Sequence, residues 1–184
     1  MTVIVGITYQ GGIVMGSDLV TRVDDMPHEK NKIKYSSHRM WAFTGTYSKQ
    51  ATELFDEYVQ NHSKKKVSLK RLERFFILMN KTLQKSLPEH RVEGMVADVY
   101  GEPQLCEYSQ TTGLKLVRSF YCKNPVLPVC LDALFNESQA IEAAINTVRT
   151  VNNTIPNYCS GIEVFTLTKE GAHRKYYEPA VLNS

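Results

Sequence analysis

Short apolar runs separated by turn residues open the chain and predict a β-hairpin. Residues 2–9 are mostly β-branched or aromatic, Gln10-Gly11-Gly12 interrupts them, and residues 13–18 resume the apolar run. With the turn near Gln10 and Gly11, antiparallel pairing sets Thr2 opposite a residue close to Asp18. The start of the chain and an acidic side chain are therefore expected to be neighbours.

The spacing of apolar residues becomes helical at Ser48. From there they recur three and four positions apart, which is typical of an amphipathic helix packed on a core. A second helix is predicted from Ser68 until Pro88, whose ring and missing N–H end it, and a third from Ser138 until before Pro156. The predicted inward positions are Ala51, Leu54, Phe55, Tyr58 and Val59 in the first helix, Leu72, Phe75, Phe76, Met79 and Leu83 in the second, and Ile141, Ala144, Ile145, Val148 and Val151 in the third.

The remaining apolar runs predict strands that are grouped before, between and after these helices. They cover 32–36, 39–44, 95–100, 105–109, 162–168 and 173–177, and the run 114–121 could extend the middle group. Gly171 ends the last turn, at a position that tolerates positive φ. Segregated runs of strands and helices predict an α+β fold, with helices on the outer faces of stacked antiparallel sheets. Residues 1–184 are expected to form a single domain.

Composition narrows the functional classes. With 42% hydrophobic and 22% charged residues the chain is of the ordinary globular class. Its apolar runs are shorter than the ~18–20 residues of a membrane span, and its amino terminus lacks the pattern of a secretory signal, so a cytoplasmic protein with no membrane partner is expected. The net charge of +3 is too small to predict nucleic-acid binding. The basic run 64–66 lies between two predicted helices and is interpreted as a solvated loop.

Cysteine and histidine spacing gives no metal site. The four cysteines, Cys106, Cys122, Cys130 and Cys159, include no C-x-x-C pair, and the five histidines lack H-x-x-x-H spacing. No G-x-G-x-x-G or G-K-[ST] motif follows a predicted strand. No metal and no cofactor are expected.

The residue that raises a question of catalysis is Thr2, directly behind Met1. Removal of the initiator methionine is favoured when the next side chain is small, and it would expose Thr2 as the terminus. A terminal threonine combines a hydroxyl nucleophile with an α-amine of pKa about 7.7–8.0, so one residue supplies both nucleophile and base.

Five segments in order resemble the proteasome β-type subunits and the related bacterial HslV peptidase, which are N-terminal-nucleophile (Ntn) hydrolases. Residues 2–7 look like the family's mature start, and 11–18 look like its glycine turn, apolar strand and Asp. Lys32-Ile33 resembles the family's Lys before an aliphatic residue, and the strand from Arg39-Met40 to Thr44-Gly45 is similar to the one that ends in its Ala-Gly. Ser160-Gly161 resembles its late Ser-Gly. The resemblance implies the four-layer αββα sandwich of the Ntn hydrolases.

The resemblance also implies a role for each matching residue. Thr2 would be the nucleophile and its free amine the proton acceptor. Lys32 would stand beside the hydroxyl as an ammonium, held by a charged hydrogen bond to Asp18. Gly45 would offer its backbone N–H to the oxyanion. Ser160 would hydrogen-bond the amine.

Two neighbours compete with Lys32 for the role of the catalytic lysine. Lys30 and Lys34 lie two residues to either side, on the same face if the segment is extended. We prefer Lys32 because it precedes Ile33 and keeps the spacing to Arg39. Without the family pattern, a solvated charge would be the ordinary interpretation of any of the three.

Three positions depart from the family pattern. Asn157 stands where the family has an Asp three residues before the late Ser, so a neutral amide replaces a carboxylate. The family's Gly-Ser-Gly before the third helix has no counterpart, and residues 119–122 occupy the corresponding region. Leu19-Val20 replaces its Ser-Arg. These departures support a divergent bacterial-type peptidase, or a subunit that keeps the fold without catalysis.

The resemblance therefore implies a hydrolase, specifically a threonine-type endopeptidase that cleaves unfolded polypeptides after removal of Met1. It would act in a homo-oligomeric ring or in stacked rings, served by an ATP-dependent unfoldase. Its substrate pocket would involve Thr21, Phe43 and Tyr47, whose bulk favours a small or apolar side chain. A catalytically silent structural subunit is the alternative, and an amide hydrolase acting on a small molecule is a third hypothesis.

Overall fold

The computed structural model describes residues 3–23, 26–29, 31–46, 48–62, 67–86, 92–117, 120–123, 135–154 and 161–178. In these parts the strands form two five-stranded antiparallel sheets and a separate two-stranded pair. The first sheet has the order β10 (Phe120–Lys123), β1 (Ile4–Tyr9), β2 (Gly12–Asp18), β11 (Ile162–Thr168) and β12 (Gly171–Tyr177). The second has the order β5 (Lys34–Tyr35), β6 (Arg39–Gly45), β7 (Val92–Asp98), β8 (Gln104–Ser109) and β9 (Gly113–Val117). The pair is β3 (Val20–Val23) and β4 (Met26–Glu29).

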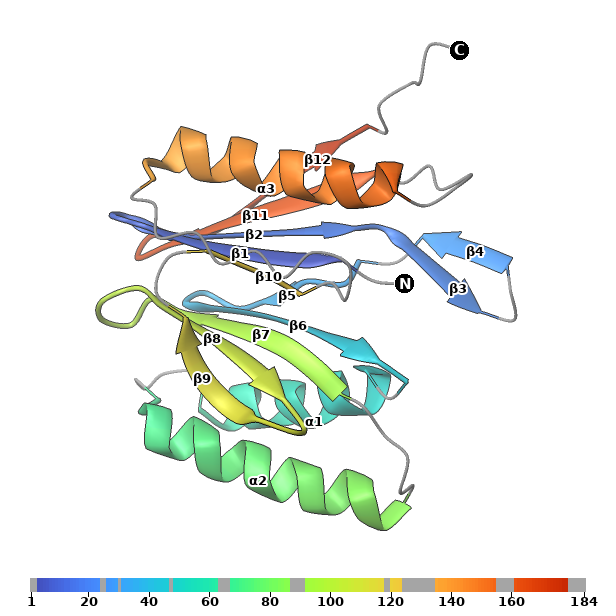
Figure 1. The fold of residues 1–184 in the computed structure, drawn as a ribbon. Helices are drawn as coiled ribbons and strands as arrows, with labels where there is room; N and C mark the ends of the chain where they lie inside the picture. The colour runs from blue at the N-terminus through green and yellow to red at the C-terminus, as the bar shows by residue number, and fades with distance from the viewer. Residues whose placement is uncertain are drawn as a thin grey trace.

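Helices cover the outer face of each sheet (Figure 1). Helix α3 (Glu137–Asn153) packs on β1, β2 and β11, whereas α1 (Ser48–Asn61) packs on β6 and β7 and α2 (Leu69–Ser86) on β9. Within the described residues the fold is therefore a mixed α+β arrangement of two antiparallel sheets and three helices, compatible with the predicted sandwich. No helix in these ranges has the length and apolar content needed to cross a membrane.

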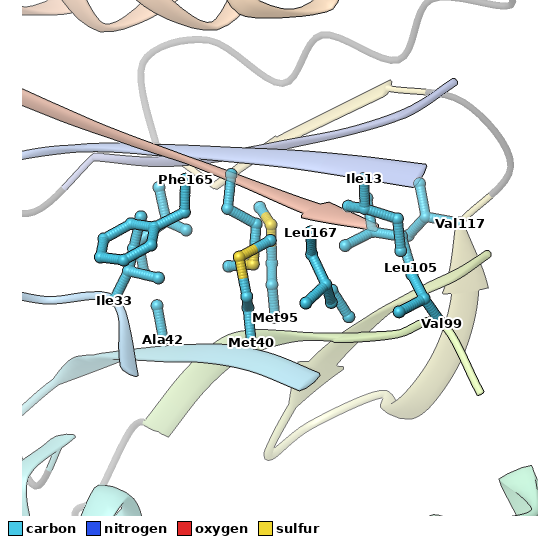
Figure 2. Close-up of a cluster of buried hydrophobic side chains, with 13 residues drawn as sticks. Ile13, Ile33, Met40, Ala42, Met95, Val99, Leu105, Val117, Phe165 and Leu167 are labelled. Atoms are coloured by element: carbon cyan, nitrogen blue, oxygen red, sulfur yellow. The ribbon is translucent and has the colours of Figure 1, made fainter. Parts of the chain in front are cut away.

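The buried side chains form three clusters that correspond to the three contacts between layers. One joins α3 to the first sheet, with Val5 and Val14 packed against Ala144 and Val148. A second fills the space between the sheets, where Figure 2 shows Met40 and Met95 at the centre, Ile33 and Phe165 at one end, and Val99 and Val117 at the other. The third joins α1 and α2 to the second sheet and is rich in aromatic rings. The alternation along the strands thus gives each sheet two buried faces.

The predicted hairpins and helices are confirmed with end shifts of a few residues, except that the strand predicted over 32–36 covers only Lys34–Tyr35. The first turn closes with Tyr9 opposite Gly12, and the last with Thr168 opposite Gly171. Gly171 has φ 138°, which only glycine adopts readily, as the sequence predicted.

Two parts of the sheets differ from the prediction. The run 114–121 does not form one strand, because β9 pairs with β8 whereas β10 pairs with β1 in the other sheet. β10 thereby covers what would otherwise be an open edge of β1. The β3–β4 pair was not predicted, since its sequence lacks apolar alternation and contains Pro27.

Candidate functional site

The carboxylate of Asp18 lies at the end of β2, beside the start of the chain. Ile4 pairs with Ser17 across the hairpin, and the preceding residue, Val3, donates its backbone N–H to Asp18 Oδ1 at 2.7 Å. The side chain of Asp18 is fully buried. The expectation that the chain start and Asp18 are neighbours is confirmed as far as Val3. Thr2 lies outside the described residues.

Lys32 forms a buried ion pair with Asp18. Its ammonium Nζ lies 2.5 Å from Asp18 Oδ2, and its side chain is only 5% exposed. Buried lysines are uncommon, because burial removes the hydration of the ammonium. The ion pair with a carboxylate must offset that lost hydration free energy. Of the two competitors, Lys34 is exposed and Lys30 lies outside the described residues.

Glu163 is a second buried carboxylate at the site, and sequence analysis did not select it. It lies on β11 opposite Ser17, and its side chain is fully buried. Oε1 accepts hydrogen bonds from the backbone N–H of Lys32 at 2.8 Å, from that of Ile33 at 3.2 Å, and from Ser17 Oγ at 3.1 Å. The signal that could have found it is a single acidic residue inside the apolar run 162–168, because a buried carboxylate requires partners.

Arg174 on β12 lies on the other side of Glu163. Its Nη2 is 3.3 Å from Glu163 Oε2, and the same nitrogen donates to Asn31 Oδ1 at 2.7 Å. Among the described residues Oε2 has no aligned hydrogen bond, so its contact with the guanidinium is a charge–charge interaction. The guanidinium also stands 5.7 Å from the centre of the Phe165 ring. Arg174 thus joins the segment before Lys32 to the first sheet.

The beginning of β11 approaches Asp18 as well. Ile162 pairs with Asp18, and Leu19 donates its backbone N–H to the Gly161 carbonyl at 3.1 Å. Two residues predicted for the site, Ser160 and Asn157, precede this segment and lie outside the described residues.

Gly45, predicted as the oxyanion donor, ends β6 and pairs with Val92 on β7. Its φ of 107° lies in the left-handed region that favours glycine. This backbone conformation by itself explains a glycine at position 45, with or without a catalytic role.

Of the three residues predicted to line a substrate pocket, Phe43 is the one whose side chain the structure describes. Phe43 is 4% exposed and packs between the second sheet and the helices, with ring centres 5.6 Å from Phe55 and 6.2 Å from Phe76. Alternation along β6 turns it to the same side as Trp41, toward the helices. Thr21 lies on β3, where only the backbone is described, and Tyr47 lies outside the described residues.

Within the described ranges, no group of three or more His, Cys, Asp or Glu side chains could hold a metal ion. The site there consists of Asp18, Lys32, Glu163 and Arg174, with Ser17 and Asn31 as neutral partners. In this set the ammonium of Lys32 is held in a fixed place, beside the carboxylate that contacts the Val3 N–H.

Comparison with known proteins adds no family to this geometry: no protein-family model matches the chain, and no curated protein shows significant sequence similarity to it.

Proposed function

We propose that the chain is an N-terminal threonine peptidase. The observation that carries this proposal is the buried ion pair of Lys32 and Asp18, which lies against the first described residue of the chain through the Val3 N–H. Thr2 directly precedes Val3. Once Met1 is removed, Thr2 would be the terminal residue. Its hydroxyl and amine would lie next to Val3, whose N–H contacts the carboxylate that holds the Lys32 ammonium.

The reaction follows from these groups. Thr2 Oγ bonds to the scissile carbonyl carbon while its proton passes to the α-amine of the same residue, and the carbonyl π electrons move to oxygen. Lys32 as an ammonium favours the developing negative charge, and Gly45 would donate its backbone N–H to the oxyanion, a contact worth ~3–4 kcal/mol in other hydrolases. The carbon–nitrogen bond then breaks, and the departing amine takes the proton. Water cleaves the Thr2 ester by the same steps and releases the acid.

The arrangement of the layers supports the proposal. Two packed antiparallel sheets, with α3 outside one and α1 and α2 outside the other, are what the four-layer αββα sandwich of the Ntn hydrolases requires. We propose this fold, and with it a homo-oligomeric ring or stacked rings that confine unfolded polypeptide, supplied by an ATP-dependent unfoldase.

The direct test is the intact mass of the purified protein before and after treatment with a threonine-directed epoxyketone or β-lactone. We expect loss of Met1 and addition of one probe per chain, both dependent on Thr2. A chain that keeps Met1 and takes up no probe would contradict the proposal, since the blocked amine cannot act as base.

Variants of the lysines sharpen this test. Lys32→Ala should lose nearly as much peptide cleavage as Thr2→Ala, because groups that act as one unit are not additive. Lys34→Ala is the matched control, since this lysine is two residues away and exposed. It should keep wild-type cleavage, and an equal loss in both lysine variants would argue against a specific role for Lys32.

The alternative is a catalytically silent structural subunit of the same fold. The substitution of an amide for a carboxylate at Asn157 favours it, as does the absence of the family's Gly-Ser-Gly. A chain that loses Met1, assembles into rings and remains unlabelled by the probe would select this alternative. Asn157→Asp would then be the variant to examine for a gain of labelling.

A further inference from the structure

We propose that Glu163 is the positioning residue for Lys32, and that Arg174 fixes Glu163 in turn. The inference rests on the proposed function for its catalytic meaning, because Lys32 is the lysine of that site. The spatial part stands on contacts among described residues alone. Glu163 and Arg174 belong to β11 and β12, far along the chain from the lysine that they hold.

The backbone at Lys32 is held by the side chain of Glu163. Residues 31–33 precede β5 and belong to no strand. Glu163 Oε1 accepts from both Lys32 and Ile33, at 2.8 and 3.2 Å. A single carboxylate oxygen thus holds two successive backbone N–H groups.

The same oxygen is fixed from the side of the first sheet. Ser17 Oγ donates to it at 3.1 Å, and Ser17 pairs with Glu163 across β2 and β11. Ile33 anchors the segment on its other side, since it is 2% exposed and lies by Phe165 at the end of the cluster between the sheets (Figure 2). The backbone of Lys32 is therefore held by Glu163 and Ile33, and its ammonium by Asp18.

Arg174 completes the arrangement from the surface. Its side chain is 41% exposed, yet its guanidinium reaches Glu163 Oε2 at 3.3 Å and Asn31 Oδ1 at 2.7 Å. It compensates the buried charge of Glu163 and ties down the residue before Lys32. Because Arg174 is partly exposed, its contribution should weaken with salt, whereas that of Oε1 should not.

The test uses the reactivity of Lys32 toward an acetylating reagent, read by peptide mass spectrometry. Lys34 serves as the internal reference because it is exposed. In Glu163→Leu, which fills a similar volume and accepts no hydrogen bond, we expect acetylation of Lys32 to rise on the order of tenfold relative to Lys34, since local opening governs access to a buried group. Glu163→Gln keeps an acceptor oxygen and should stay close to wild type.

A control for general loosening is available in the other sheet. Asp98 is also a carboxylate in a buried ion pair, 2.6 Å from Arg39 Nε, and lies on β7 in the second sheet. Asp98→Asn should weaken the fold and leave the acetylation of Lys32 unchanged. If Glu163→Leu does not fold, Arg174→Met takes its place, with a rise of about threefold expected because only the outer contact is lost. An unchanged Lys32 in these variants, or an equal rise in Asp98→Asn, would overturn the positioning role.

Peptide cleavage by the same proteins separates this inference from the proposed function. In an active chain, Glu163→Leu should lower kcat about 100-fold with KM unchanged, because a small displacement of a catalytic group has effects of that order. Glu163→Gln should restore most of the activity. If the wild-type chain cleaves nothing, the proposed function fails, while the acetylation result still decides whether Glu163 holds Lys32.

Discussion

The buried ion pair of Asp18 and Lys32 allows a quantitative test that is independent of any activity. The perturbations are Asp18→Asn, which removes the charge and keeps the shape, and Lys32→Met, which keeps an unbranched stem and removes the ammonium. Each single variant leaves one buried charge without the partner that now lies 2.5 Å from it. The double variant leaves neither charge.

The expected magnitude follows from burial. Asp18 is fully buried and the Lys32 side chain is 5% exposed, so water can solvate neither charge once its partner is removed. Breaking such a pair by removing one partner costs about 3–5 kcal/mol, within the ~5–15 kcal/mol by which domains are stable. The double variant should be less destabilised than the sum of the single ones, by about 1–3 kcal/mol, because the coupling between the two charges is counted twice in that sum.

Urea unfolding followed by tryptophan fluorescence measures these values, since the chain has a single tryptophan and Trp41 is 4% exposed. The matched control is the exposed pair Lys49 and Glu53 on α1, 4.0 Å apart, for which the same cycle should give no more than ~0.5 kcal/mol. Losses at Asp18 and Lys32 that add within ~0.5 kcal/mol would refute the buried pair.

Three further predictions concern stability. Burial raises the pKa of the Cys106 thiol and of the Tyr108 hydroxyl to about 12, above their ordinary 9.0 and 10.0, so the unfolded chain releases these protons first. The free energy of unfolding should therefore fall as pH rises from about 9 towards 12, and Cys106→Ala should remove the earliest part of that fall; urea midpoints independent of pH in this range would contradict it. Gly45→Ala places a side chain at φ 107° and should cost about 1–2 kcal/mol, measured as a lower urea midpoint, whereas an unchanged midpoint would argue against that backbone geometry. Asn136→Ala removes the capping box that Asn136 forms with Gln139 at the start of α3 and should cost about 1 kcal/mol, which thermal unfolding would show as a lower Tm.

Much of the fold can be predicted from the sequence, because each helix and hairpin is formed by residues that are close together along the chain. The first hairpin and the three helices each have a period that a short window contains, and they appear where it predicts them. The pairing of β10 with β1 joins residues more than a hundred positions apart, and nothing periodic in 114–121 indicates that the run divides between two sheets. Long-range pairing of that kind is decided by which edge remains open after the local elements form.

The site was predictable to a different degree. Hairpin register alone placed the start of the chain near Asp18, whereas the choice of Lys32 among three lysines depended on the family pattern. The sequence did not indicate Glu163 and Arg174 as site residues. A carboxylate in an apolar strand and an arginine in an edge strand each have ordinary structural interpretations in a single sequence. Only the register of β2 with β11 brings Glu163 to the segment that it holds.

The same register explains why polar groups gather at one end of the layer between the sheets. On the faces that β2 and β11 turn toward the second sheet, Ile13 pairs with Leu167 and Met15 with Phe165, and the next pair is Ser17 with Glu163. The face is thus apolar over two successive pairs and polar at the third, where the hydrophobic cluster ends. A carboxylate there is excluded from water by the cluster and by the segment 31–33, so its partners must come from the protein. The apolar core and the polar site therefore depend on one strand alignment. A shift of β11 by one residue would turn Glu163 away from Lys32 and break both.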